Sequence, residues 1–168
     1  MADDPLIDSA GQAVVYPFTA FSFSVEINVE GVAKQICDAA FSECDGLEMT
    51  MDVKTIREGG NNGKQIRLTG PINYGQVTMK RGMTANFDLW YWFEEMLTNP
   101  GLRADAEVVI FTPNGQDERA RFRLSRCVPT KLKSPPLNAK EGGVAIEELQ
   151  LSYESVSLIK PKRGTPSA

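Results

Sequence analysis

The alternation of apolar and polar positions is clearest at Phe21–Glu30, where it runs without interruption. Such strict alternation predicts a β-strand with one buried face and one face in water. Glu30-Gly31 predicts a tight turn, and Ala33–Cys44 predicts a second strand, so we expect these strands to form a hairpin. The apolar positions of the first strand are Phe21, Phe23, Val25, Ile27 and Val29.

Alternation recurs later in the chain and predicts further strands connected mainly by hairpins. In one of these strands the alternation changes phase at Arg126-Cys127, which predicts a β-bulge. A proline-containing connection is expected to follow that strand from Pro129 to Gly143. The expected strands are Tyr74–Arg81, Glu107–Thr112, Arg119–Val128 and Val144–Leu158.

Asn86–Leu97 is the one stretch whose apolar residues recur with helical spacing. Thr84 is expected to be its N-cap, and Asn99-Pro100-Gly101 is expected to end it. The apolar residues cover more than one face, so we expect a helix that is buried on most sides. The residues predicted to pack in the core are Phe87, Trp90, Tyr91, Phe93 and Leu97.

These elements predict a mainly β fold, an antiparallel β-sandwich or barrel with one packed α-helix. The length of 168 residues fits a single domain that spans 1–168. Residues 1–16 show no consistent period and predict a loose N-terminal arm, and residues 159–168 predict a basic C-terminal tail.

Composition removes several classes of function. The net charge of −4 argues against a nucleic-acid-binding domain, and the absence of histidine removes the usual general base and metal ligand. The three cysteines, Cys37, Cys44 and Cys127, are too scattered for a zinc site or a disulfide framework. We therefore expect no enzyme, cofactor or metal. With no apolar run of ~20 residues and no secretory signal, we expect synthesis in the cytoplasm.

Glu48–Lys64 predicts a long projecting hairpin with a flexible Gly/Asn tip. It carries three basic and three acidic residues, and this neutral balance suits docking on a copy of the same chain. The alternative is a solvated hairpin without a partner, although loops of this length are often functional.

Arg119, Arg121 and Arg123 form a basic stripe on one expected strand. The stripe could bind a polyanion or line a pore, but a solvated strand face paired with acidic neighbours is the favoured interpretation. The expected partners lie on the last strand and are Glu148, Gln150 and Glu154. From chemistry alone, the sequence indicates a soluble β-rich domain with an aromatic helix and a projecting hairpin.

The order of these elements resembles a known family. The features are the alternating first hairpin, Lys80-Arg81-Gly82 leading into the aromatic helix, Arg123–Val128 continuing through Pro129-Thr130-Lys131, and the closing segment Val144–Glu154. Over roughly Pro17–Leu158 the chain is similar to the tail tube proteins of contractile phage tails and of the related extracellular contractile injection systems.

The resemblance implies a structural subunit that closes into sixfold rings through a shared barrel. The rings would stack into a hollow inner tube, which sheath contraction drives through a target envelope while the lumen carries a payload. The implied partners are the sheath, the baseplate and spike, and the terminator. The implied location is a phage tail or phage tail-like particle, released by lysis or anchored in the cell.

The resemblance also implies roles for particular residues. Contacts between rings are expected at Met49, Met51, Asp52, Val53, Lys54, Arg57, Glu58, Asn61 and Asn62. A lumen or inter-protomer face is expected at Arg119, Arg121, Arg123, Glu148, Gln150 and Glu154.

Two other functions stay open at this point. One is a small-ligand or flavin-binding split β-barrel, and the other keeps the tube fold in a secreted, type VI-like ring. Phage tails and injection systems use the same tube subunit, and overall resemblance favours an injection system slightly.

Overall fold

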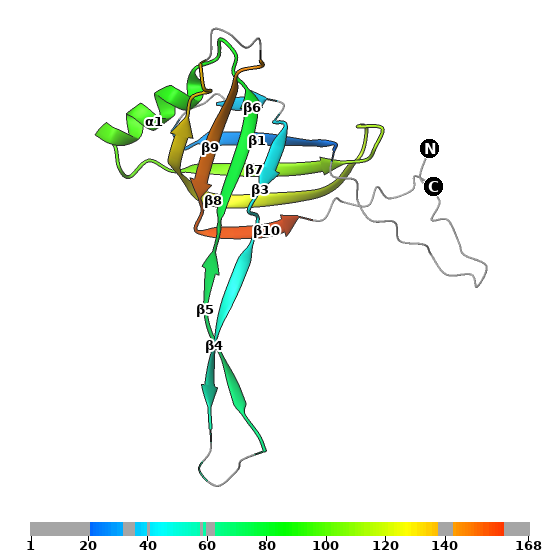
Figure 1. Cartoon of the computed structure of the whole chain (residues 1–168), viewed down its shortest axis with the longest axis vertical. Helices are drawn as coiled ribbons and strands as arrows, with labels where there is room; N and C mark the ends of the chain where they lie inside the picture. Colours follow the sequence, from blue (N-terminus) through cyan, green and yellow to red (C-terminus); the bar gives the residue numbers. More distant parts are fainter. Residues whose placement is uncertain are drawn as a thin grey trace, which may run out of the picture.

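The computed structural model describes residues 21–31, 36–39, 41–57, 59, 63–137 and 143–159 (Figure 1). The predicted arm 1–16 lies outside the described residues, and so does the predicted tail apart from Ile159. The strands are β1 (Phe23–Val29), β2 (Cys37–Ala39), β3 (Glu43–Asp45), β4 (Met49–Ile56), β5 (Ile66–Tyr74), β6 (Gln76–Gly82), β7 (Ala104–Phe111), β8 (Glu118–Lys133), β9 (Ile146–Ser152) and β10 (Ser155–Ile159), and the helix is α1 (Asp88–Thr98).

The body is a β-sandwich in which one strand belongs to both layers. Sheet 1 has the order β2-β1-β7-β8-β10, and sheet 2 has the order β8-β9-β6-β3. All neighbouring strands are antiparallel. In Figure 1 the strands of sheet 1 run across the view, and those of sheet 2 run along the long axis. This crossing is typical of orthogonal packing, in which a bent strand makes the corner. The predicted fold class is confirmed.

The corner of the sandwich lies at Arg126, within β8. Its φ of 54° is unusual for a residue with a side chain, and the register with β7 slips between Ala104 and Ala106. The bulge predicted at Arg126-Cys127 is therefore confirmed. Beyond it β8 pairs with β9 as far as Lys133, so the predicted end of this strand at Val128 is wrong. Pro129 is tolerated because this half of β8 has one neighbour among the described strands.

Two segments predicted as single strands are each divided between the sheets. Ala33–Cys44 contains β2, which forms the predicted hairpin with β1, and then β3, which pairs with β6 in sheet 2. Buried Phe41 lies at the crossing. Val144–Leu158 likewise divides into β9 and β10, and Glu154 in the break donates its amide to the Ser125 carbonyl. Alternation alone did not reveal these changes of sheet.

The core fills the space between the two sheets with the inward residues of their strands. Val25, Ile27 and Val29 of β1 are buried as the alternation predicts, whereas Phe21 is 70% exposed. Leu149, Leu151 and Tyr153 of the last segment are also buried. The other large buried side chains include Val77, Met79, Leu89, Trp92, Val108 and Leu124.

Helix α1 lies at the end of the sandwich away from the long hairpin (Figure 1). The predicted stop at Asn99 is confirmed, because its amide is the last to bond within the helix, to Glu95 O. The predicted N-cap is wrong. The Thr84 hydroxyl accepts from the Asn86 amide instead, and it is the Asn86 side chain that accepts from the Asp88 amide at the helix start.

The prediction that α1 is buried on most sides is also wrong for this protomer. Leu89 and Trp92 are buried, while Trp90 and Phe93 are half-buried. Phe87, Tyr91 and Leu97 are 43%, 63% and 75% exposed, so they do not pack in the core. The physical reason is position: a helix at the end of the sandwich covers it with one face and leaves the other in solvent.

Candidate assembly surfaces

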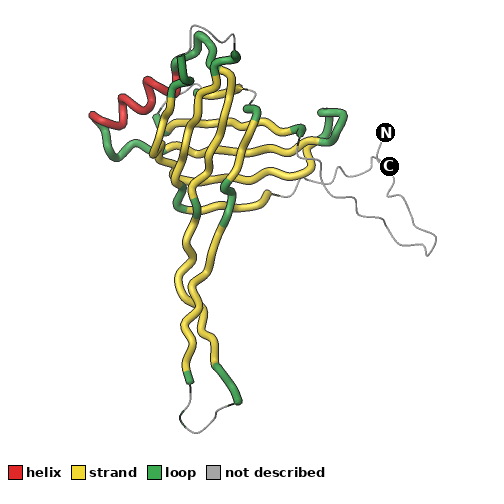
Figure 2. Tube along the Cα trace, in the orientation of Figure 1, coloured by secondary structure: helices red, strands yellow, loops and turns green. Residues whose placement is uncertain are grey.

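The long hairpin β4–β5 leaves the body as a separate two-stranded sheet (Figure 2). Every residue of β4 is exposed, although the strand is rich in apolar side chains. The exposed apolar side chains are Met49 (64%), Met51 (48%), Val53 (55%), Ile56 (41%), Ile66 (42%), Leu68 (45%) and Ile72 (46%). An isolated hairpin is marginal in water, and a large apolar patch marks a contact site. This surface therefore indicates a partner.

The residues predicted for ring contacts lie mostly on this hairpin. Met49, Met51, Asp52, Val53, Lys54 and Arg57 are all exposed there. Glu58, Asn61 and Asn62 lie outside the described residues. Sequence reasoning did not assign Ile56, Ile66, Leu68 or Ile72 to this surface. The pattern was present, because Ile66, Leu68 and Ile72 return along β5 beside the apolar positions of β4.

A tyrosine anchors the base of the hairpin to the body. The Tyr153 hydroxyl donates to the Glu48 carbonyl at 2.8 Å and accepts from the Glu48 amide at 3.2 Å. Its ring lies 5.7 Å from that of Tyr74, the last residue of β5. Burial raises the pKa of Tyr153, which keeps the hydroxyl protonated as a donor. The body thus holds the hairpin at the point where it emerges.

Replacing Tyr153 with phenylalanine is expected to lower the free energy of unfolding by about 1–2 kcal/mol, because the hydroxyl bonds both the backbone amide and the backbone carbonyl of Glu48. Urea unfolding of dilute protein measures this. Tyr91→Phe is the matched control, since Tyr91 is 63% exposed, and its cost should stay within about 0.5 kcal/mol. Equal costs for the two variants would refute the anchoring role.

Sheet 2 ends in two open edges. Among the described residues, β3 pairs only with β6, and the second half of β8 pairs only with β9. Unpaired edge strands expose amides and carbonyls that pair readily with another chain. Within the part of the chain that the structure describes, sheet 2 therefore presents one free edge on each side.

The outward face of sheet 2 is polar and internally paired. Lys80 Nζ lies 2.9 Å from the Glu43 carboxylate, and Lys131 Nζ lies 2.8 Å from Glu148 Oε1. The hydrogen bond from Lys131 lowers the pKa of Glu148. Glu148 and Gln150 therefore belong to this face, where Gln150 also donates to the Thr78 hydroxyl at 3.3 Å. Among the described residues, three acidic and three basic ones lie on this face: Glu43, Asp45, Glu148, Lys80, Lys131 and Lys133.

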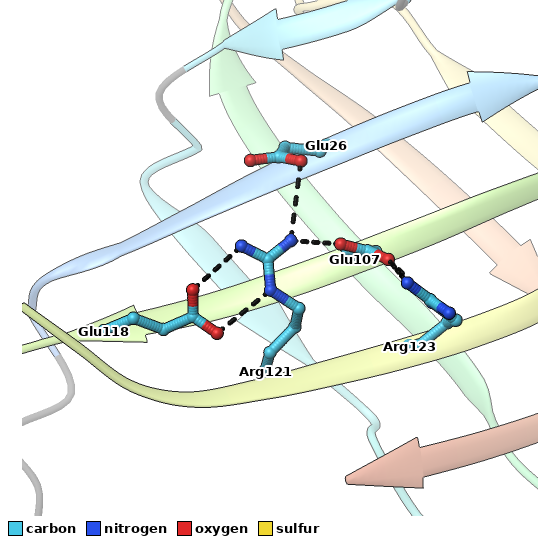
Figure 3. A network of polar contacts seen from close by, with 5 residues as sticks. All are labelled: Glu26, Glu107, Glu118, Arg121 and Arg123. Atoms are coloured by element: carbon cyan, nitrogen blue, oxygen red, sulfur yellow. Dashed lines mark hydrogen bonds and ion pairs between the residues drawn. The ribbon is translucent and has the colours of Figure 1, made fainter. Parts of the chain in front are cut away.

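The outward face of sheet 1 carries a separate ionic network (Figure 3). Arg121 bonds the carboxylates of Glu107 and Glu118, and lies 3.8 Å from that of Glu26. Arg123 lies 2.6 Å from Glu107. Burial alone would raise the pKa of Glu107, but the hydrogen bonds from the two arginines outweigh it and lower that pKa. This network satisfies both arginines within the protomer.

The predicted grouping of Arg119, Arg121 and Arg123 with the last strand is wrong. In this half of β8 the neighbours are β7 and β10, so Arg121 and Arg123 meet Glu107 and not Glu148 or Gln150. Arg119 is exposed at the start of β8. Glu154 lies at the break between β9 and β10, where it bonds Arg126 at 2.9 Å. The six residues predicted as one face thus occupy three places.

A buried ion pair joins the helix to sheet 2, and sequence reasoning missed it. Arg81 and Glu147 are register partners on β6 and β9, each 2% exposed, and Arg81 Nε donates to Glu147 Oε1. Trp90 Nε1 donates to Glu147 Oε2 at 3.4 Å, and Arg81 donates to the Asn86 carbonyl at 3.4 Å. The sequence did contain a clue to this pair. Glu147 alternates in step with Leu149 and Leu151, so its side chain is expected to point inward, and a buried carboxylate requires a partner.

The described residues offer little reactive chemistry. Burial raises the pKa of Cys127 to about 12 and that of Cys44 to about 11, so neither thiol ionises at neutral pH. No cluster of three or more potential metal ligands occurs among the described residues. Within the same residues, no helix has the length and apolar character needed to cross a membrane.

Comparison with known proteins identifies the family. Residues 19–157 match the family described as T4-like virus tail tube protein gp19. No curated protein matches the chain. The chain is similar to a solved structure of the anti-feeding prophage baseplate, 6-fold symmetrised, with 23% identity, a TM-score of 0.78, and coverage of 89% of this chain and 100% of the other.

A second similar structure is the sheath-tube complex of PVC, an extracellular contractile injection system, in the extended state. Identity is 20% and the TM-score is 0.74, with 92% of this chain and 99% of the other covered. The anti-feeding prophage tube-terminating cap gives 20% identity, a TM-score of 0.75 and the same coverage. These likenesses support the tube fold, and nothing in them supports a ligand-binding split barrel. The resemblance inferred from the sequence is confirmed, and the chain belongs to the T4-like virus tail tube protein family.

Proposed function

We propose that this tail tube protein is the repeating subunit of the inner tube of a contractile injection particle. Six protomers close a ring by placing the second half of β8 of one protomer beside β3 of the next. Each protomer then contributes the four strands of sheet 2 to one continuous barrel, and ring closure satisfies both open edges. The single observation that carries this proposal is the pair of unpaired edges on sheet 2.

In this arrangement the outward face of sheet 2 lines the lumen. Its three acidic and three basic residues leave the face without net charge, and its remaining side chains include Gln76, Thr78, Gln150 and Ser152. Such a surface is hydrophilic and favours neither polyanions nor polycations. We infer a lumen suited to a payload of mixed charge, such as protein. The role is structural and uses no catalytic group.

The partners follow from the same arrangement. A sheath surrounds the tube, a baseplate with its spike starts it, and a terminator ends it. The anti-feeding prophage and PVC structures, which include a baseplate, a sheath-tube complex and a tube-terminating cap, support this inference. The protein is assembled in the producing cell and becomes part of a phage tail-like particle, released by lysis or anchored in the cell.

The hairpin is proposed to join successive rings. Deleting Gly59–Gly63 shortens its tip, so the variant is expected to form single rings but no tubes. Negative-stain electron microscopy and light scattering of the purified chain measure this, with wild-type protein examined at the same concentration. An unchanged circular dichroism spectrum controls for folding. Tubes of normal length from the deletion variant would contradict the role of the hairpin, and wild-type protein without rings or tubes would contradict the proposed function.

A further inference from the structure

Two regions of the chain carry opposite charge. The hairpin tip, residues 53–68, contains four basic residues and one acidic residue, a net charge of +3. The helix region, residues 86–99, contains three acidic residues and no basic one, a net charge of −3. The charged residues of the tip are Lys54, Arg57, Glu58, Lys64 and Arg67, and those of the helix are Asp88, Glu94 and Glu95. The two regions are therefore electrostatically complementary.

Both regions also expose apolar side chains beside these charges. At the tip, Ile56 pairs with Ile66, and Leu68 pairs with Lys54 on the same face of the ribbon. Phe87, which immediately precedes α1, and Tyr91 stand one turn apart, and Leu97 lies near the end of the helix. An apolar patch with a charged rim is the usual composition of a protein–protein contact. Each region thus has the composition expected of one side of a protein–protein interface.

The apolar pairs of the hairpin lie on both faces of the ribbon. At the base, the pairs Met49–Tyr74 and Met51–Ile72 share one face of the ribbon. The register then slips between Met51 and Val53, and the apolar pair Ile56–Ile66 at the tip falls on the opposite face. The two strands also cross in the view of Figure 1, so the ribbon is twisted between its base and its tip. The apolar pair at the tip is therefore a patch separate from the pairs at the base.

The two regions lie at opposite ends of the molecule. In Figure 1 the hairpin points down the long axis, and α1 lies beside the upper end of the sandwich. A strand of eight residues spans roughly 26 Å, so the tip reaches well beyond its own body. A contact between two different surfaces at opposite ends does not close on itself, and it repeats along an axis.

We propose that the basic, apolar hairpin tip of one protomer docks on the acidic, apolar face of α1 in a protomer of the next ring. This inference rests on the proposed function and specifies which surfaces join the rings. Burial of Phe87 and Tyr91 beneath the hairpin supplies apolar contact, while Glu94 and Glu95 meet basic side chains of the tip. The exposed face of α1 is in this way covered in the tube.

A charge exchange tests the contact. The hairpin variant Lys54→Glu/Lys64→Glu and the helix variant Glu94→Lys/Glu95→Lys are each expected to raise the critical concentration for tube formation at least ~10-fold, because like charges then face each other across the contact. The chain carrying all four substitutions is expected to form tubes at a concentration near that of wild type. Electron microscopy counts rings and tubes, and light scattering gives the critical concentration.

The matched control is Glu30→Lys/Asp117→Lys, which changes the net charge as much as the helix variant does, at exposed residues away from α1. This control is expected to form tubes as wild type does. If the helix variant also forms normal tubes, or if the four-substitution chain fails to recover, the hairpin docks elsewhere and the inference is overturned. If α1 faces the sheath and not the next ring, the helix variant forms normal tubes. Rings present in all variants keep the proposed function intact, so the two failures are distinguishable.

Discussion

Glu147→Gln is expected to lower the free energy of unfolding by about 3–5 kcal/mol, the usual cost of removing one partner of a buried ion pair. Arg81 and Glu147 are each 2% exposed, so water cannot replace the lost carboxylate. The substitution removes the charged group that pairs with Arg81 Nε inside the protein. It also removes the carboxylate to which the Trp90 indole donates.

The matched control is Glu154→Gln, the same chemical change in a pair that is 56% exposed on both sides. Its cost should stay below about 1 kcal/mol, because exposed pairs contribute little. Urea unfolding of dilute protein measures both values. Near-equal costs would show that burial of the Arg81 pair has little energetic consequence.

A double substitution separates charge from packing at the same site. Arg81→Met/Glu147→Leu removes both charges and keeps apolar volume, so it is expected to be less destabilising than Glu147→Gln alone. If the double variant has a lower free energy of unfolding than Glu147→Gln, the two residues do more for stability than neutralise each other's charge. The bonds from Arg81 to Asn86 and from Trp90 to Glu147 indicate such a need, because they fix the start of α1 on sheet 2.

Local pattern predicted the elements of this fold well and their pairing less well. The alternation at Phe23–Val29 and at Leu149–Tyr153 has a period of two, which depends only on neighbouring residues. The bulge at Arg126 was visible for the same reason. By contrast, the divisions at Phe41 and at Glu154 depend on which sheet each half joins. That choice is made by long-range pairing with β6 and β8, and no local window contains it.

The assembly surfaces were predictable to a similar degree. The hairpin was found because Met49, Met51 and Val53 alternate within a segment rich in turn residues. The arginine stripe was assigned the wrong partners, because Arg121 and Arg123 lie before the corner of β8 and Glu148 pairs beyond it. The outward face of α1 was misjudged because the helical pattern shows how apolar a helix is and not how much of it is covered. A helix that looks buried in sequence is exposed here, as expected for a surface that awaits another copy.

Gly46→Ala is expected to destabilise the protein by about 3 kcal/mol or more, through two separate effects. Gly46 has a φ of +90°, which costs a residue with a side chain about 1–2 kcal/mol. The added Cβ would also lie 2.1 Å from the Gln76 carbonyl oxygen of β6, so that backbone must move. The bonds of β3 to β6 lie next to this contact, and β3 is one of the two open edges of sheet 2.

Gly31→Ala carries the first effect without the second. Gly31 has a similar φ of +82°, but a Cβ there meets nothing within 4 Å, so its cost should be only the about 1–2 kcal/mol of the backbone conformation. Urea unfolding gives the difference between the two variants, and electron microscopy shows whether rings still close. If the two costs are equal, the β6 backbone at Gln76 moves at little cost, and the contact between Gly46 and Gln76 is not tightly packed. If Gly46→Ala alone loses rings while most of the protein stays folded at low temperature, the close approach at Gly46 holds β3 in place for ring closure.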